Sequence, residues 1–186
     1  MAKKGLDYVA FAKYEYSNGT TTYSDGVHLS PAASFNAAIN TNVQNDYGDN
    51  YAVESVSEVT GGTLSVELTN EDSDIYSFLL GAVKGVTGAT GSEVTSIKSK
   101  TSDVPPLVGA AAIGESGSKY KIRLYKKCQF SEPNDDNTTR QEATAFGHIT
   151  LSGNILIPED KEWRIIEEYN TLDAAIAALK TLFGIT

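Results

Sequence analysis

Cysteine is nearly absent from the sequence, with Cys128 the only one among 186 residues. A single thiol excludes an internal disulfide and a zinc site built from several thiolates. No uninterrupted apolar run reaches the roughly 20 residues that cross a bilayer, so we expect no membrane-spanning segment. Lys3, Lys4 and Asp7 also interrupt the apolar stretch that a secretory signal would need near the start. We therefore expect a protein that is made and kept in the cytoplasm.

Sequence patterns that carry chemistry are also missing. The two histidines, His28 and His148, have no metal-ligand partner nearby in the sequence. Residues 45–50 are rich in Asn and Asp but lack the alternating acids and closing Glu of a calcium loop, which favours a polar turn. Residues 85–91 are rich in glycine, yet no Lys follows them to reach a phosphate. The sequence therefore predicts no catalytic residue, metal ligand or cofactor, and indicates a protein that is not an enzyme.

Basic residues are absent from one large part of the chain. Residues 14–83 contain ten acids and no Lys or Arg, whereas residues 119–127 contain five bases and no acid. One interpretation is two solvated charged faces. The other is that the acidic part of one subunit contacts the basic strand of an identical neighbour, in a head-to-tail contact that forms rings or filaments. The residues expected at this contact are Glu54, Glu58 and Glu67 on one side and Lys119, Lys121 and Arg123 on the other.

Most of the chain has the alternation of β-strands. Residues 33–43 alternate with a period of two, which predicts a strand with one buried and one exposed face. Glycine-containing turn signals at residues 17–19, 24–26 and 60–62 each predict a hairpin turn. The expected strands are residues 6–16, 20–29 interrupted at 24–26, 33–43, 51–59, 63–68, 106–113, 120–130, 139–157 with a break near Gly147, and 162–169.

Two helices are expected beside these strands. The first covers about residues 71–80 and is capped by Asn70 or Asp72. Thr171 caps the second, whose apolar stripe runs to a stop at Gly184.

A Gly/Ser/Thr-rich segment separates the two groups of strands. It covers residues 83–103, shows no periodicity and is expected to form a flexible loop. Several strands with two helices predict an α+β fold, mainly an antiparallel β-sandwich or barrel with two flanking helices. The length of 186 residues fits a single domain over residues 1–186.

Several segments, taken in order, carry a resemblance to a known family. They are residues 3–10, the Tyr-Ser-Asp-Gly turn at 23–26, Tyr-Gly-Asp-Asn at 47–50 followed by Glu54-Ser55, Thr-Gly-Gly-Thr-Leu at 60–64, the Phe-Ser-Glu-Pro corner at 130–133, and the Trp163 strand with its terminal helix. Together they resemble the major tail protein, the tail-tube subunit of long non-contractile bacteriophage tails. The resemblance covers most of the chain.

This resemblance implies a structural protein of the virion tail, made in the cytoplasm of a bacterial host. Its subunits would form hexameric rings that stack into a tube, with tape-measure and other tail proteins as partners. DNA would pass through without specific binding, and an acidic chain suits this passage because a Lys/Arg-rich lining would hold the phosphate backbone. The second interpretation, based on ten Tyr and many Asn, is a carbohydrate- or protein-binding β-sandwich module.

Overall fold

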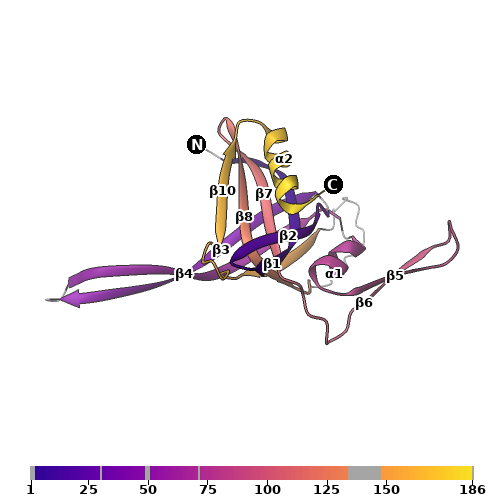
Figure 1. The fold of residues 1–186 in the computed structure, drawn as a ribbon, viewed down its shortest axis with the longest axis horizontal. Coiled ribbons are helices and arrows are strands. Elements are labelled where there is room, and N and C mark those ends of the chain that lie inside the picture. Colours follow the sequence, from indigo (N-terminus) through magenta and orange to yellow (C-terminus); the bar gives the residue numbers. More distant parts are fainter. Residues whose placement is uncertain (1–2, 30, 49–50, 71, 134–147, 186) are drawn as a thin grey trace, which may run out of the picture.

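The computed structural model describes residues 3–29, 31–48, 51–70, 72–133 and 148–185. These ranges form an α+β fold of mostly antiparallel strands with two helices, as the sequence predicts (Figure 1). The elements are β1 Lys3–Ser17, β2 Thr20–Val27, β3 Ala32–Gly48, β4 Tyr51–Leu68, α1 Ser73–Leu79, β5 Val83–Thr87, β6 Val94–Lys98, β7 Val108–Ser116, β8 Lys119–Ser131, β9 Ile149–Ile155, β10 Arg164–Tyr169 and α2 Leu172–Phe183.

The main sheet has the strand order β2-β1-β7-β8-β9-β4-β3, and β10 also pairs with β8. The first part of β8 pairs with β10, and its last part pairs with β9. The change of partner occurs at a bulge, where Lys126 and Lys127 lie opposite the single residue Gly109 of β7. Strand β8 therefore has two neighbours on the same edge, β10 along its first part and β9 along its last part. We call these two parts the halves of the sheet, and the bulge lies where they meet.

The central strands β1, β7 and β8 are covered on both faces. Val9, Phe11 and Phe130 lie in one core cluster, together with side chains from β4, β9 and α1. Ala10 and Ala111 lie in the other cluster, beneath α2. Small alanines on that face let the helix pack close to the sheet.

Both predicted helices are present, and α1 is shorter than the expected residues 71–80. Asp72 caps α1 by accepting a hydrogen bond from the Asp74 backbone N–H at 3.0 Å. Thr171 caps α2 by accepting from the Ala174 N–H at 3.3 Å, and Gly184 ends α2 in the left-handed conformation.

Two of the three predicted hairpin turns are wrong, and each is a bulge within a long strand. The Asn18-Gly19 turn joins β1 to β2, but Asp25 and Gly26 lie inside β2, where the register shifts. Gly61 and Gly62 likewise lie inside β4, which continues to Tyr51. In both places a glycine accommodates a close backbone: a Cβ on Gly26 would overlap the Phe183 carbonyl oxygen, and one on Gly62 the Ala38 carbonyl oxygen. The glycines therefore mark close approaches and not chain reversals.

The segment expected as an irregular loop over residues 83–103 contains secondary structure. Strands β5 and β6 form a two-stranded antiparallel hairpin that extends from the body near α1 (Figure 1). The sequence missed it because its strands have only five residues each and both faces are largely exposed. Its mobility stays a prediction. The expected strand over residues 139–157 is described only from residue 148, as β9, and the rest lies outside the described residues.

Candidate assembly surface

The outer half of the β3–β4 hairpin, residues 41–48 and 51–60, extends far from the body of the protein (Figure 1). We call this segment the arm. Its described side chains are exposed at residues 41–44 and 55–58, and Val43 and Val56 are 54% and 58% exposed. A two-stranded hairpin on its own is marginally stable in water, because neither of its faces is covered. The arm therefore has the character of a segment that packs against something else.

The inner face of the arm continues a face that is packed in the body. Phe35, Ala37 and Ile39 of β3 pack against the core, whereas Thr41 and Val43 follow on the same face and are exposed. The clean alternation in the sequence predicts one buried face for this whole strand. That prediction holds up to Ile39 and fails beyond it, because the body of the subunit ends there.

The register gives the arm two chemically different faces, since residues directly opposite each other share a face. Val43 pairs with Ser57 on the inner face, which is uncharged at its described residues. On the outer face Gln44 pairs with Val56, and Asn42 pairs with Glu58. An acid thus lies beside an exposed valine on the outer face only.

The three acids predicted at a contact are distributed along β4. Glu58 is exposed on the outer face of the arm. Glu67 lies in the body, and its Oε1 is 2.8 Å from Nδ1 of His148. Glu54 belongs to the arm by its backbone register opposite Asp46, and its side chain lies outside the described residues.

The predicted basic residues lie on β8, and acids of the same chain contact several of them. Lys119 and Lys121 both pair with Glu168 of β10, with the Lys121 nitrogen at 2.6 Å. The pKa of Glu168 is lowered, mainly by its hydrogen bond from Lys121. Arg123 lies opposite Ile166 of β10, on the same face as Lys121. The structure thus places the three bases together and leaves their contact with a second subunit as a prediction.

Residues 158–163 supply further acids that the sequence analysis did not single out. Lys127 donates to Glu159 at 2.6 Å, and Lys126 donates to Asp160 and Glu162. A count of charges along the chain cannot find these pairs. The sequence signal that could have found these pairs is the concentration of acids in residues 159–168, because the pairing of β10 with β8 brings this segment alongside the lysines.

The β8–β10 pair also has two different faces. Lys121, Arg123 and Ile166 lie on one of them. The other face, with α2, forms an apolar groove of about 540 Å³. Its lining includes Ile122, Leu124, Ile165, Tyr169, Ala178 and Leu182. In the described residues β10 pairs with β8 alone, so its second edge is open.

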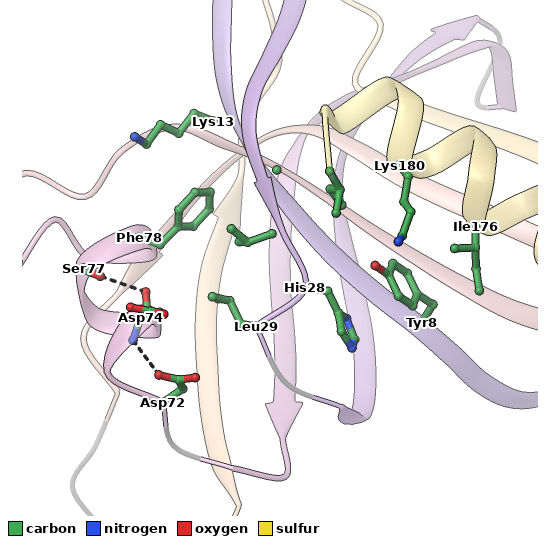
Figure 2. A pocket seen from close by; sticks show the side chains of 13 residues that line it. Tyr8, Lys13, His28, Leu29, Asp72, Asp74, Ser77, Phe78, Ile176 and Lys180 are labelled. Atoms are coloured by element: carbon green, nitrogen blue, oxygen red, sulfur yellow. Dashed lines mark hydrogen bonds between the residues drawn. The ribbon is translucent and has the colours of Figure 1, made fainter. Parts of the chain in front are cut away.

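A larger open groove, about 830 Å³, lies between α1, β2 and the end of α2 (Figure 2). Its polar groups serve local structure: Asp72 caps α1, and the His28 ring stacks on Tyr8 with a centroid separation of 4.3 Å. His28 Nδ1 also lies 2.6 Å from the Val9 carbonyl oxygen. These contacts give His28 a structural role in this groove.

Reactive groups are not clustered in the part of the chain that is described. No three His, Cys, Asp or Glu side chains there are arranged to hold a metal ion. Cys128 is fully buried, and burial raises the pKa of its thiol. Neither described helix has the length and apolarity needed to cross a bilayer.

The architecture defines a class, an α+β protein with a mainly antiparallel sheet and two flanking helices. Compared with models of known protein families and with curated proteins, the sequence matches none.

Proposed function

We propose that this chain is a tail-tube subunit of a long-tailed bacteriophage, which assembles with its own copies into stacked hexameric rings. The arm is the observation that carries the proposal. Its inner face continues the core-facing side of β3, yet Val43 is 54% exposed there. Burial of such apolar surface is the main favourable term in protein association. A neighbouring subunit that covers the arm supplies this burial.

The resemblance to tail-tube subunits gives the proposal its particular form. The tube encloses the tape-measure protein first and the DNA later, and other tail proteins bind its ends. The net charge of −9 supports free passage of DNA, because a basic lining would release counterions and hold the duplex. The subunit acts by shape and assembly and needs no bound cofactor.

A second candidate function is a carbohydrate- or protein-binding β-sandwich module. The apolar groove between α2 and β10 favours it, because Tyr169 there offers an aromatic surface beside apolar side chains. Such a module stays monomeric when its ligand is absent. Association state therefore separates the two candidates.

The test is sedimentation velocity over a wide range of protein concentration and salt, with negative-stain electron microscopy of the same samples. A tail-tube subunit is expected to form rings or tubes as concentration rises, or when other tail proteins are added. A strict monomer under all these conditions contradicts the proposal and favours the binding module.

A further inference from the structure

We propose that the inner face of the arm packs onto the outer side of α2 and the apolar groove beside it in a neighbouring subunit. Side chains make this contact, face against face, and no backbone ladder joins the two chains. The inference rests on the proposed function and identifies the two surfaces that meet in the assembly. The occupant of the groove is thus a second copy of this chain.

Helix α2 is apolar on almost every side. Only Asp173, Lys180 and Thr181 are polar among its twelve residues, and one face is buried against the sheet. On the outer side Ala177 is exposed, and Leu182 is 47% exposed. A surface helix ordinarily has charged side chains opposite its buried face, whereas a helix that is apolar all round is buried. The outer side of α2 therefore needs a cover that the described part of its own subunit does not supply.

The outer side of α2 continues into the apolar groove of about 540 Å³. Ala178 and Leu182 contribute to its lining from α2, and Ile165 contributes from β10. Among the described residues that line the groove only Glu167 is charged, and it accepts a hydrogen bond from the Tyr169 hydroxyl at 2.6 Å. The groove is therefore suited to an uncharged surface and disfavours an acidic one.

The two faces of the arm differ in how they suit this groove. The inner face has Val43 opposite Ser57 and is uncharged at its described residues. The outer face has Glu58, which would bring a second carboxylate toward Glu167. Like charges brought together at an interface oppose binding. The charges thus select the inner face of the arm as the one that meets the groove.

The arm and the groove lie on different sides of the subunit. The arm extends to the left of the body, whereas α2 lies near its top (Figure 1). Because the arm extends away from its own body, the groove that it covers belongs to a neighbour. Two different surfaces of one chain that meet in this way form a heterologous contact, which repeats from subunit to subunit and makes a ring where the rotation closes.

The contact removes exposed apolar side chains of both partners from water. Val43 on the arm is 54% exposed, and Leu182 on α2 is 47% exposed. The side chains beside them are small: Ser57 lies next to Val43, and Ala178 lines the groove with Leu182. Small side chains let the arm approach the helix closely, so that the two exposed side chains can be covered. Burial of this apolar surface favours association.

Thiol cross-linking between separate chains tests the contact. Chains with Val43→Cys are mixed with size-tagged chains with Leu182→Cys, assembled, and treated with bismaleimidoethane, a short thiol cross-linker. We expect a covalent pair containing one chain of each kind, and the native Cys128 is fully buried. The matched control uses Gln44→Cys in place of Val43→Cys, because Gln44 is the next residue of the same strand and lies on the outer face. It is expected to form little of this product.

A charge placed on the outer side of α2 provides a second measurement. Ala177→Glu is expected to abolish assembly at concentrations at which the parent assembles, because the contact would bury an unpaired carboxylate. The fold is expected to persist, because Ala177 is exposed in the subunit and Glu is a good helix former. Ala177→Ser is the matched control, small and uncharged, and is expected to assemble like the parent. Normal assembly of Ala177→Glu contradicts the contact.

The outcomes separate this inference from the function on which it rests. Normal tubes without the cross-link, or with an equal yield from the Gln44 control, overturn the inference and leave the tail-tube proposal standing. Tubes without the cross-link that are lost in Ala177→Glu also overturn it, because another segment of the neighbour then covers α2. A strict monomer at every concentration overturns both proposals. Cross-linked pairs in samples that form rings or tubes support both.

Discussion

Lys126 donates a hydrogen bond from Nζ to the Glu162 Oε2 at 3.0 Å, at the bulge where β8 changes partner. It also donates to Asp160, and only 4% of the residue is exposed. Burial by itself lowers the pKa of Lys126, but the hydrogen bonds to the two carboxylates outweigh it, so the pKa is raised. The connection between β9 and β10 thus holds a buried cation at the junction of the two halves of the sheet.

Asp160→Asn is expected to destabilise the protein by about 2 kcal/mol. The substitution removes one of the two carboxylates that compensate a buried ammonium, and breaking a buried ion pair is costly. Urea unfolding at neutral pH, followed by circular dichroism, measures the change. Glu162→Gln is the control, because its side chain is 63% exposed and it is expected to cost less than about 1 kcal/mol. Equal effects of the two substitutions would contradict this account of Lys126.

Acid is expected to destabilise the fold between about pH 4.5 and pH 2. The hydrogen bond from Lys127, and then that from the Tyr14 hydroxyl, lower the pKa of Glu159 from 4.5 to about 2. A lowered pKa contributes stability that is present above the unfolded value and is lost as pH falls through the folded value. Burial opposes the shift at Asp160, yet the hydrogen bond from Lys126 lowers its pKa as well.

Glu159→Gln tests this assignment. The variant lacks the carboxylate, so the difference in Tm between it and the parent is expected to shrink as pH falls from 5 to 2. Thermal melts at several pH values provide the measurement. A constant difference over this range would show that Glu159 contributes in some other way.

The fold class and both helices were predictable because local patterns decide them. Caps at Asp72 and Thr171 need only short-range contacts. The hairpin turns were harder, because Gly26 and Gly62 serve close approaches of distant backbone that a sequence pattern does not show. Glycine beside Asp or Thr predicts a turn from the local sequence. In the fold, packing against distant backbone makes these residues bulges inside strands.

The candidate surface was predictable only in part. The sequence predicted a contact between the acidic part of one subunit and the basic strand of another, and this contact stays a prediction, although Lys121 and Arg123 do share one face. The intramolecular partner Glu168 could not be identified, because it depends on the pairing of β10 with β8. The length of the arm depends on where the body ends, and Val43 continues the alternation of the buried part without any change in pattern.

Gly62→Ala is expected to cost about 1–3 kcal/mol, because its Cβ would overlap the Ala38 carbonyl oxygen and force the backbone apart. Gly85→Ala is the matched control, since Gly85 also lies in a strand and its Cβ would meet only the Ser96 hydroxyl at 3.3 Å. The control is expected to stay within about 0.5 kcal/mol of the parent. Urea unfolding of both variants provides the comparison, and equal stabilities would show that β3 and β4 can separate at this point without cost.

The Cys128 thiol is expected to resist modification in the folded protein. It is fully buried, and burial raises the pKa of the thiol, so the reactive thiolate is scarce. Ellman's reagent is expected to react fully in denaturant and only slowly without it. Rapid reaction of the native protein would contradict this burial.

Shortening the arm is expected to abolish assembly while the fold persists. Replacing residues 42–58 with Asn-Gly joins Thr41 to Val59 through a tight turn. The core contacts of Phe35 and Leu64 lie outside the deletion, so Tm is expected to stay close to that of the parent. The rings or tubes are expected to disappear, because the edge and both faces of the arm are gone. Sedimentation velocity measures association, and circular dichroism measures folding.

The control for removal of the arm replaces residues 88–93 with Asn-Gly, which shortens the β5–β6 hairpin and should leave association intact. Assembly that survives removal of the arm would show that other surfaces join the subunits.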